Sequence, residues 1–177
     1  MVNNQIYIWV RLIVPIYLTF TLNVNGQNIS KNYSSSIQNN GMLYFVFPQK
    51  GFENNKYRGK LTYDITYLTS KDTATLNFSY FEKSNRDIDS ISFSNEAIKF
   101  SGSVKKIFIE TNKLNWHYRY STKVSFTDLN SFFIPNSNPK ITIYSKQGDI
   151  LLSTKQSDWI KKASKTKKIL TLISLNK

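Results

Sequence analysis

One row of polar side chains near the middle of the sequence could bind an anion. His117, Arg119 and Lys123 are separated by two and four residues within segment 114–126. Successive side chains of a β-strand point to opposite faces, so a strand would place all three on one side. The solvated face of an antiparallel sheet commonly shows the same pattern, which is the alternative interpretation. Since His117 is the only histidine, a histidine triad or a multi-histidine metal site would depend on this one imidazole, and we predict neither.

Acidic residues offer little support for catalysis. Asp64 falls in an alternating segment, and Asp87 and Asp89 form a close pair in a charged, irregular stretch. A general acid and a general base can be far apart in a sequence, so a carboxylate-dependent hydrolase stays open as an alternative. The sequence has no Gly-rich phosphate loop, no Gly-x-Ser-x-Gly elbow and no His-Glu-x-x-His motif, and it has no cysteine. We therefore expect a protein that is not an enzyme and that needs no cofactor or metal.

The excess of positive charge is concentrated at the C-terminus. Residues 155–177 contain seven lysines and one aspartate, which is +6 of the chain's formal net charge of +13. A helix over about 157–175 would place Lys161, Lys165 and Lys168 on one face. Such a basic helix can bind anionic lipid, lipopolysaccharide or polysaccharide. The alternative is that these lysines form the solvated back of a helix packed on the domain.

The other face of the same segment carries an apolar seam, with Ser157 as the expected N-cap. The pattern weakens after Lys167, so a final strand over 169–175 competes with a helix that continues to the end. We favour the continuous helix. The seam repeats at spacings of four and three residues, and its members are Trp159, Ala163, Thr166, Leu170 and Ile173.

The clearest strand of the chain is the segment 114–126 itself. A helix would scatter its aromatic residues around the circumference, whereas a strand buries them on one face. Segment 104–110 precedes it and should pair with it as a hairpin, with Lys105 and Lys106 at a solvent-facing edge. The predicted inward residues, interrupted only by Thr122, are Leu114, Trp116, Tyr118, Tyr120, Val124 and Phe126.

A second hairpin is expected from the alternating segments 61–67 and 76–80. A loop with an even number of residues places the apolar faces of the two strands on the same side of the hairpin. An odd number would shift the pairing by one residue and place Asp64 opposite Phe78. We favour a loop of about four residues, since Lys-Asp is a poor pair for a two-residue turn. The expected register pairs Tyr67 with Leu76, Ile65 with Phe78, and Tyr63 with Tyr80.

The remaining segments complete a β-rich pattern. Residues 27–40 are rich in Asn and Ser without periodicity and predict a flexible lead-in. Segment 42–47 is a strand that Pro48 should close, and a polar loop is expected over 49–59. Further strands are expected at 91–93, 98–100, 141–145 and 150–153, with Gly148 turning the last hairpin and a one-turn helix at 127–133.

The N-terminus resembles a secretory signal. Arg11 precedes the apolar run 12–22, and a polar stretch follows with a plausible cut after Gly26. Residues 1–26 are therefore predicted to be removed, and the protein to be periplasmic or secreted. An uncleaved membrane anchor over 6–24 is the alternative.

These elements predict one mainly β domain over 41–177. We expect a single antiparallel sandwich or partly closed barrel of about seven to nine strands, with the C-terminal helix packed on it. The expected function is that of an exported, non-catalytic module that contacts envelope polyanions through its basic C-terminus. The alternative is a carrier of a small apolar ligand inside an aromatic-lined barrel. Nucleic acid is the less favoured partner, because the aromatic residues belong to the buried face.

Overall fold

The computed structural model describes residues 27–56 and 58–176, and ten strands and three helices lie in this part of the chain. The predicted signal segment 1–26 lies outside the described residues. The helices are α2 (Gln27–Ser30), α3 (Phe126–Phe132) and α4 (Gln156–Leu175). The strands are β1 (Tyr33–Gln38), β2 (Gly41–Asn54), β3 (Gly59–Leu68), β4 (Thr73–Glu82), β5 (Ile88–Ser94), β6 (Lys99–Ser103), β7 (Lys105–Asn112), β8 (Asn115–Ser125), β9 (Lys140–Ser145) and β10 (Ile150–Leu152).

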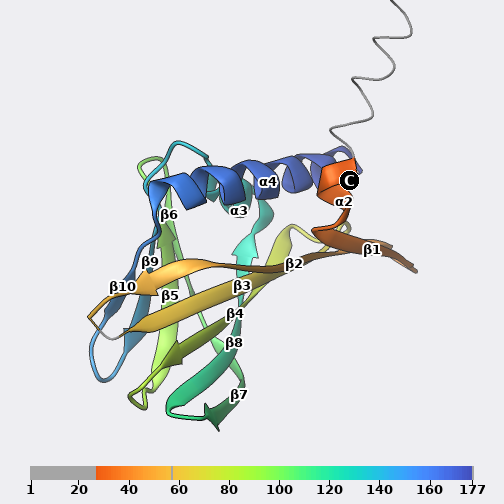
Figure 1. Cartoon of the computed structure of the whole chain (residues 1–177). Coiled ribbons are helices and arrows are strands. Elements are labelled where there is room, and N and C mark those ends of the chain that lie inside the picture. Colours follow the sequence, from red (N-terminus) through yellow and green to blue (C-terminus); the bar gives the residue numbers. More distant parts are fainter. Residues whose placement is uncertain (1–26, 57, 177) are drawn as a thin grey trace, which may run out of the picture.

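The strands form two antiparallel sheets with α4 lying across one end (Figure 1). The six-stranded sheet has the order β1-β2-β3-β4-β8-β7, and the four-stranded sheet has the order β10-β9-β5-β6. Buried side chains of both sheets, α3 and α4 belong to one core. The predicted class, a mainly β sandwich with a C-terminal helix, is confirmed, and the partly closed barrel is not what forms. The strand beyond the expected nine is β1.

Strand β8 buries its aromatic face as predicted. Tyr118, Tyr120 and Val124 point into the core, and β8 pairs with β4 on one side and β7 on the other. The expectation for Leu114 was wrong, because 86% of its surface is exposed. Asn112 pairs with Asn115 in the β7–β8 hairpin, so Leu114 belongs to the turn that joins the strands and lies outside the alternation.

The β3–β4 hairpin has the expected four-residue connection, but its register differs by two residues. Ile65 lies opposite Leu76, Tyr63 opposite Phe78, and Leu61 opposite Tyr80. The loop therefore consists of residues 69–72 instead of 70–73, so it has the same length and begins one residue earlier in the chain. A shift of two residues keeps each side chain on its own face, so the alternation alone does not distinguish the two registers.

Segments 27–40 and 49–59 are more ordered than expected. Residues 27–40 contain α2 and β1 where we predicted a flexible lead-in, because β1 is held by backbone pairing to β2 and not by an alternating apolar face. Pro48 does not close β2, which continues to Asn54. It sits where the β2–β3 register shifts between Val46 and Gln49, and such a bulge tolerates a residue without an N–H group.

The two longer helices match the expectation with small differences at their starts. Ser125 caps α3, its hydroxyl accepting a hydrogen bond from the Asp128 N–H at 3.4 Å. Helix α4 is continuous, so the strand alternative at 169–175 was wrong, and Lys155 occupies the N-cap position that we expected for Ser157. All five seam residues are buried, together with Ile169. Among the described helices none is both long enough and apolar enough to span a membrane.

Candidate functional site

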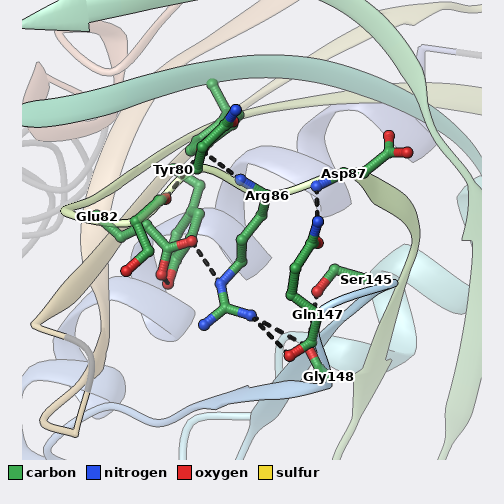
Figure 2. Close-up of polar contacts among 10 residues, drawn as sticks. Tyr80, Glu82, Arg86, Asp87, Ser145, Gln147 and Gly148 are labelled. Carbon is green, nitrogen blue, oxygen red and sulfur yellow. Dashed lines mark hydrogen bonds and ion pairs between the residues drawn. The ribbon is translucent and has the colours of Figure 1, made fainter.

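A buried polar cluster lies where the chain crosses from the six-stranded sheet to the four-stranded one. Glu82 ends β4 and Arg86 lies in the connection to β5, and their exposed fractions are 1% and 7%. The Arg86 Nε pairs with the Glu82 Oε1, and the Tyr80 hydroxyl donates to the Glu82 Oε2 at 3.1 Å. Figure 2 shows the Arg86 guanidinium between Glu82 and the turn of the β9–β10 hairpin.

Further hydrogen bonds tie this connection to its neighbours. The Arg86 Nη1 lies 3.4 Å from the carbonyl oxygens of both Gln147 and Gly148, and the Gln147 side chain accepts from the Asp87 N–H at 3.0 Å. The Arg86 N–H donates to the Tyr118 hydroxyl at 2.8 Å. The cluster thus fixes the β4–β5 connection both to β8 and to the β9–β10 turn.

Burial dominates the ionisation of the cluster. Desolvation raises the pKa of Glu82 above its ordinary value, although the Arg86 charge and the Tyr80 hydrogen bond oppose this shift. Desolvation also raises the pKa of Tyr118 to about 12, and the pKa of Tyr80 rises further because the Glu82 carboxylate adds to the effect of burial. A carboxyl group with a raised pKa can serve as a general acid. Glu82 is only 1% exposed, and the contacts of the cluster hold the β4–β5 connection in place.

The anion row predicted on β8 is largely engaged with acidic partners. The Arg119 Nη2 pairs with the Asp64 Oδ1, and its Nη1 donates to the Ser79 hydroxyl at 3.2 Å. The His117 Nδ1 lies 2.9 Å from the Glu110 Oε1, and the imidazole stacks on the Phe81 ring at 4.1 Å. Lys123 is exposed on the same face. Only Lys123 of the three therefore presents a cation without a carboxylate beside it in the described structure.

An apolar depression of about 350 Å³ lies on this outer face beside Arg119. Phe45 and Phe47 line it, each with 41% of its surface exposed, together with Pro48 and Asp64. The sequence did not indicate these exposed rings, because the apolar run 42–47 reads as uniformly buried. The interior rings expected to line a ligand cavity instead contact one another, as in the stacked Phe78 and Tyr120 at 5.7 Å between centroids.

The lysines predicted on α4 lie on its exposed face. Lys161, Lys165 and Lys168 are all exposed, opposite the buried seam. Lys167, which the prediction did not include, donates from its Nζ to the Asn130 carbonyl at 2.8 Å. The helix has Asp158 as its one acidic residue, so the charged residues of its solvent face are almost all basic.

A hollow of about 340 Å³ adjoins the start of this lysine face. It lies between β2 and the first turns of α4, and its charged lining consists of Lys50, Lys155, Lys162, Glu53 and Asp158. Sequence reasoning missed Lys50 because it placed residues 49–59 in a loop. Glu53 was missed for the same reason, whereas the helical spacing of Lys155, Asp158 and Lys162 was the available signal for the remaining three.

The structure does not bring the two groups of predicted anion-contact residues together. His117, Arg119 and Lys123 alternate with core residues of β8, whereas Lys161, Lys165 and Lys168 lie outside the seam of α4. On both β8 and α4, the face opposite these residues is buried in the same core. That core therefore separates the two groups. The α4 face is therefore the stronger candidate for anion contact.

The acidic residues considered for catalysis do not converge. Asp64 is paired with Arg119 and accepts from the Asn77 amide at 2.9 Å, and Asp87 forms an exposed ion pair with Lys146 at 2.7 Å. Among the residues that the structure describes, no group of three His, Asp or Glu side chains could hold a metal ion. Comparison of the chain with family models, with curated proteins and with solved structures gives no match.

Proposed function

We propose that this protein is a non-catalytic module that binds a polyanion along the exposed face of α4. The observation that supports this most is the row of Lys161, Lys165 and Lys168, which are exposed on a helix without any acid after Asp158. Residues three and four apart are neighbours on a helix, so the three ammonium groups follow one another along the axis. A ligand with regularly spaced phosphate, carboxylate or sulfate groups matches this arrangement.

The packing of α4 favours binding by a preformed surface. Trp159 is 1% exposed, its indole N–H donates to the Ile134 carbonyl at 2.8 Å, and its ring stacks on Phe133 at 5.6 Å. The lysine stems are therefore attached to a rigid backbone, and only their side-chain freedom is lost when an anion binds. Lys50, Lys155 and Lys162 extend the basic surface into the neighbouring hollow.

Export is part of the proposal and rests on the signal-like segment 1–26. In an envelope or outside the cell, the polyanions within reach are anionic lipid, lipopolysaccharide and acidic polysaccharide. All three present closely spaced anionic groups, so one lysine row can serve each of them.

Charge-matched variants test the proposal. We expect salt-sensitive retention on heparin, on lipopolysaccharide resin or on vesicles with anionic lipid, and the three arms distinguish the source of the anionic groups. Replacing Lys161, Lys165 and Lys168 together by Gln should remove most of the retention. The slope of the logarithm of the binding constant against the logarithm of the salt concentration should become smaller in magnitude by roughly one for each lysine replaced. Replacing the exposed Lys83, Lys99 and Lys140 by Gln removes the same charge elsewhere and should change little. Equal losses in both triple variants would mean that net charge alone causes retention, and the proposal would be wrong.

A further inference from the structure

The free edges of the two sheets are not equally protected against pairing with another strand. Edge strands usually carry lysines, bulges or very short pairings that discourage such pairing. In the described residues, β7 carries Lys105 and Lys106 beside a register shift, and β10 is three residues long. Strand β6 begins with Lys99 and packs on β8, where Gly102 lies close to Thr122.

Strand β1 has none of these devices. Its sequence, Tyr-Ser-Ser-Ser-Ile-Gln, contains no charge and no proline, and its six residues pair with β2 without a register shift. Its other side forms the edge of the six-stranded sheet, and no described strand pairs there. Figure 1 shows the β1–β2 hairpin extending away from the rest of the sheet. The edge is therefore flat, uncharged and accessible.

The backbone groups that face this free edge can be assigned. The Phe47 N–H donates to the Asn32 carbonyl at 2.9 Å, so the even-numbered residues of this strand turn their backbone groups toward β2. In an antiparallel ladder the intervening residues turn theirs to the opposite side. The N–H and C=O groups of Tyr33, Ser35 and Ile37 consequently point away from β2.

The side chains of the same three residues share the interior face of the sheet. Tyr33 packs there with its ring 6.2 Å from that of Tyr44. Ile37 lies farther along and is 84% exposed, because no described element covers the hairpin at that point. An added strand would both satisfy the free backbone groups and offer Ile37 a neighbour.

We propose that β1 pairs with β1 of a second copy of this chain, antiparallel about a two-fold axis at Ser35. Outward backbone groups must meet outward ones, so Tyr33, Ser35 and Ile37 of one copy can face only these residues in the other. Centring the axis on Ser35 places Tyr33 opposite Ile37 twice, an aromatic and β-branched pair of the kind that stabilises sheets. The same register places Lys31 opposite Asn39, so no like charges meet.

The pairing joins two six-stranded sheets into one continuous sheet with a self-complementary interface. Moving the axis by one residue would place Tyr33 opposite Ser35 or Ser35 opposite Ile37, and in either case both Tyr33 and Ile37 would lose their apolar partners. The register is therefore specified by the two apolar residues of β1.

Cysteine cross-linking tests the register, because the chain has no cysteine of its own. In a hydrogen-bonded antiparallel pair the Cα atoms are about 5.5 Å apart, which suits a disulfide. Ser35→Cys should therefore give a cross-linked dimer under mild oxidation. Ser34→Cys is the control: it faces Ser36 of the other copy and lies about 7–8 Å from its own equivalent, beyond disulfide reach.

Association without cross-linking provides the second measurement. Sedimentation of the purified chain should show a monomer–dimer equilibrium that Ser35→Lys shifts toward monomer by about tenfold or more in Kd, since two lysines would meet at the axis. Ser36→Lys faces Ser34 and should have a smaller effect. A chain that stays monomeric at every concentration, or equal cross-linking of both cysteine variants, would overturn the proposal. Circular dichroism of each variant verifies that the sheets remain folded.

Discussion

Arg86→Met should destabilise the fold strongly, because it leaves the Glu82 carboxylate buried without its cation. The side chains of Arg86 and Glu82 are 6% and 1% exposed, so water cannot replace the missing partner. Removing one member of a buried ion pair costs about 3–5 kcal/mol of unfolding free energy at neutral pH. The substitution also removes the weaker hydrogen bonds of Arg86 to the carbonyl oxygens of Gln147 and Gly148, each at 3.4 Å.

The pH dependence of this variant follows from the direction of the Glu82 shift. Burial raises the Glu82 pKa above its ordinary value of 4.5, and Arg86 opposes that effect. Without Arg86 the pKa rises further, so the folded state holds a proton that the unfolded chain has already released. Stability therefore falls as the pH rises from the unfolded pKa to the folded pKa, by up to about 1.4 kcal/mol per pH unit. Conversely, acidification should recover part of the stability that Arg86→Met removes.

A double-mutant cycle in urea, followed by tryptophan fluorescence at pH 5 and pH 7, measures both effects. The double variant Glu82→Gln with Arg86→Met carries no buried charge and should be more stable at pH 7 than Arg86→Met alone. Its stability should also lack the pH dependence of the single variant. A loss below about 1 kcal/mol for Arg86→Met, with the same value at both pH values, would refute the assignment of a buried, coupled pair.

Two other expectations concern separate parts of the chain. A Cβ atom at Gly59 would overlap the Tyr80 hydroxyl oxygen, so Gly59→Ala should lower the unfolding free energy by about 1–3 kcal/mol, measured by urea titration. Gly148→Ala is the comparison, because a Cβ atom at Gly148 would have no atom within 4 Å. That variant should show only the backbone strain of the positive φ at Gly148. Mass measurement of the chain recovered from cells should give a product that begins at Gln27, and a product that retains residues 1–26 would exclude cleavage after Gly26.

The alternation of apolar and polar residues predicted the faces of the long strands but not their partners. It identified β3, β4 and β8 and most of the apolar side chains that each one buries. It left the β3–β4 register undetermined by two residues, since Tyr63 is interior whether it faces Phe78 or Tyr80. A connection over residues 69–72 instead of 70–73 gives the observed register, and the geometry of a turn of ordinary polar residues is weakly encoded in its sequence.

Elements that backbone pairing stabilises gave no such signal. Strand β1 and the second half of β2 show little apolar alternation, because one lies at a sheet edge and the other contains register shifts around Pro48 and Gly51. The buried Glu82–Arg86 pair was equally hidden. A spacing of four residues in a charged segment is common on protein surfaces, and only the crossing from β4 to β5 takes these two side chains into the interior.

The exposed face of α4 and the free edge of β1 differ in what the sequence reveals about them. The lysine face of α4 is visible in the sequence, because its helical spacing and its single acid at Asp158 can be read directly. The edge of β1 becomes recognisable only by comparison with β7, whose Lys105 and Lys106 show how this chain protects an exposed strand. Strands β1 and β7 are the two edges of the same sheet. Because β7 is protected against strand pairing and β1 is not, we infer that another strand normally covers the β1 edge. Tyr33 and Ile37, the two apolar residues of β1, favour a second copy of β1 as that strand.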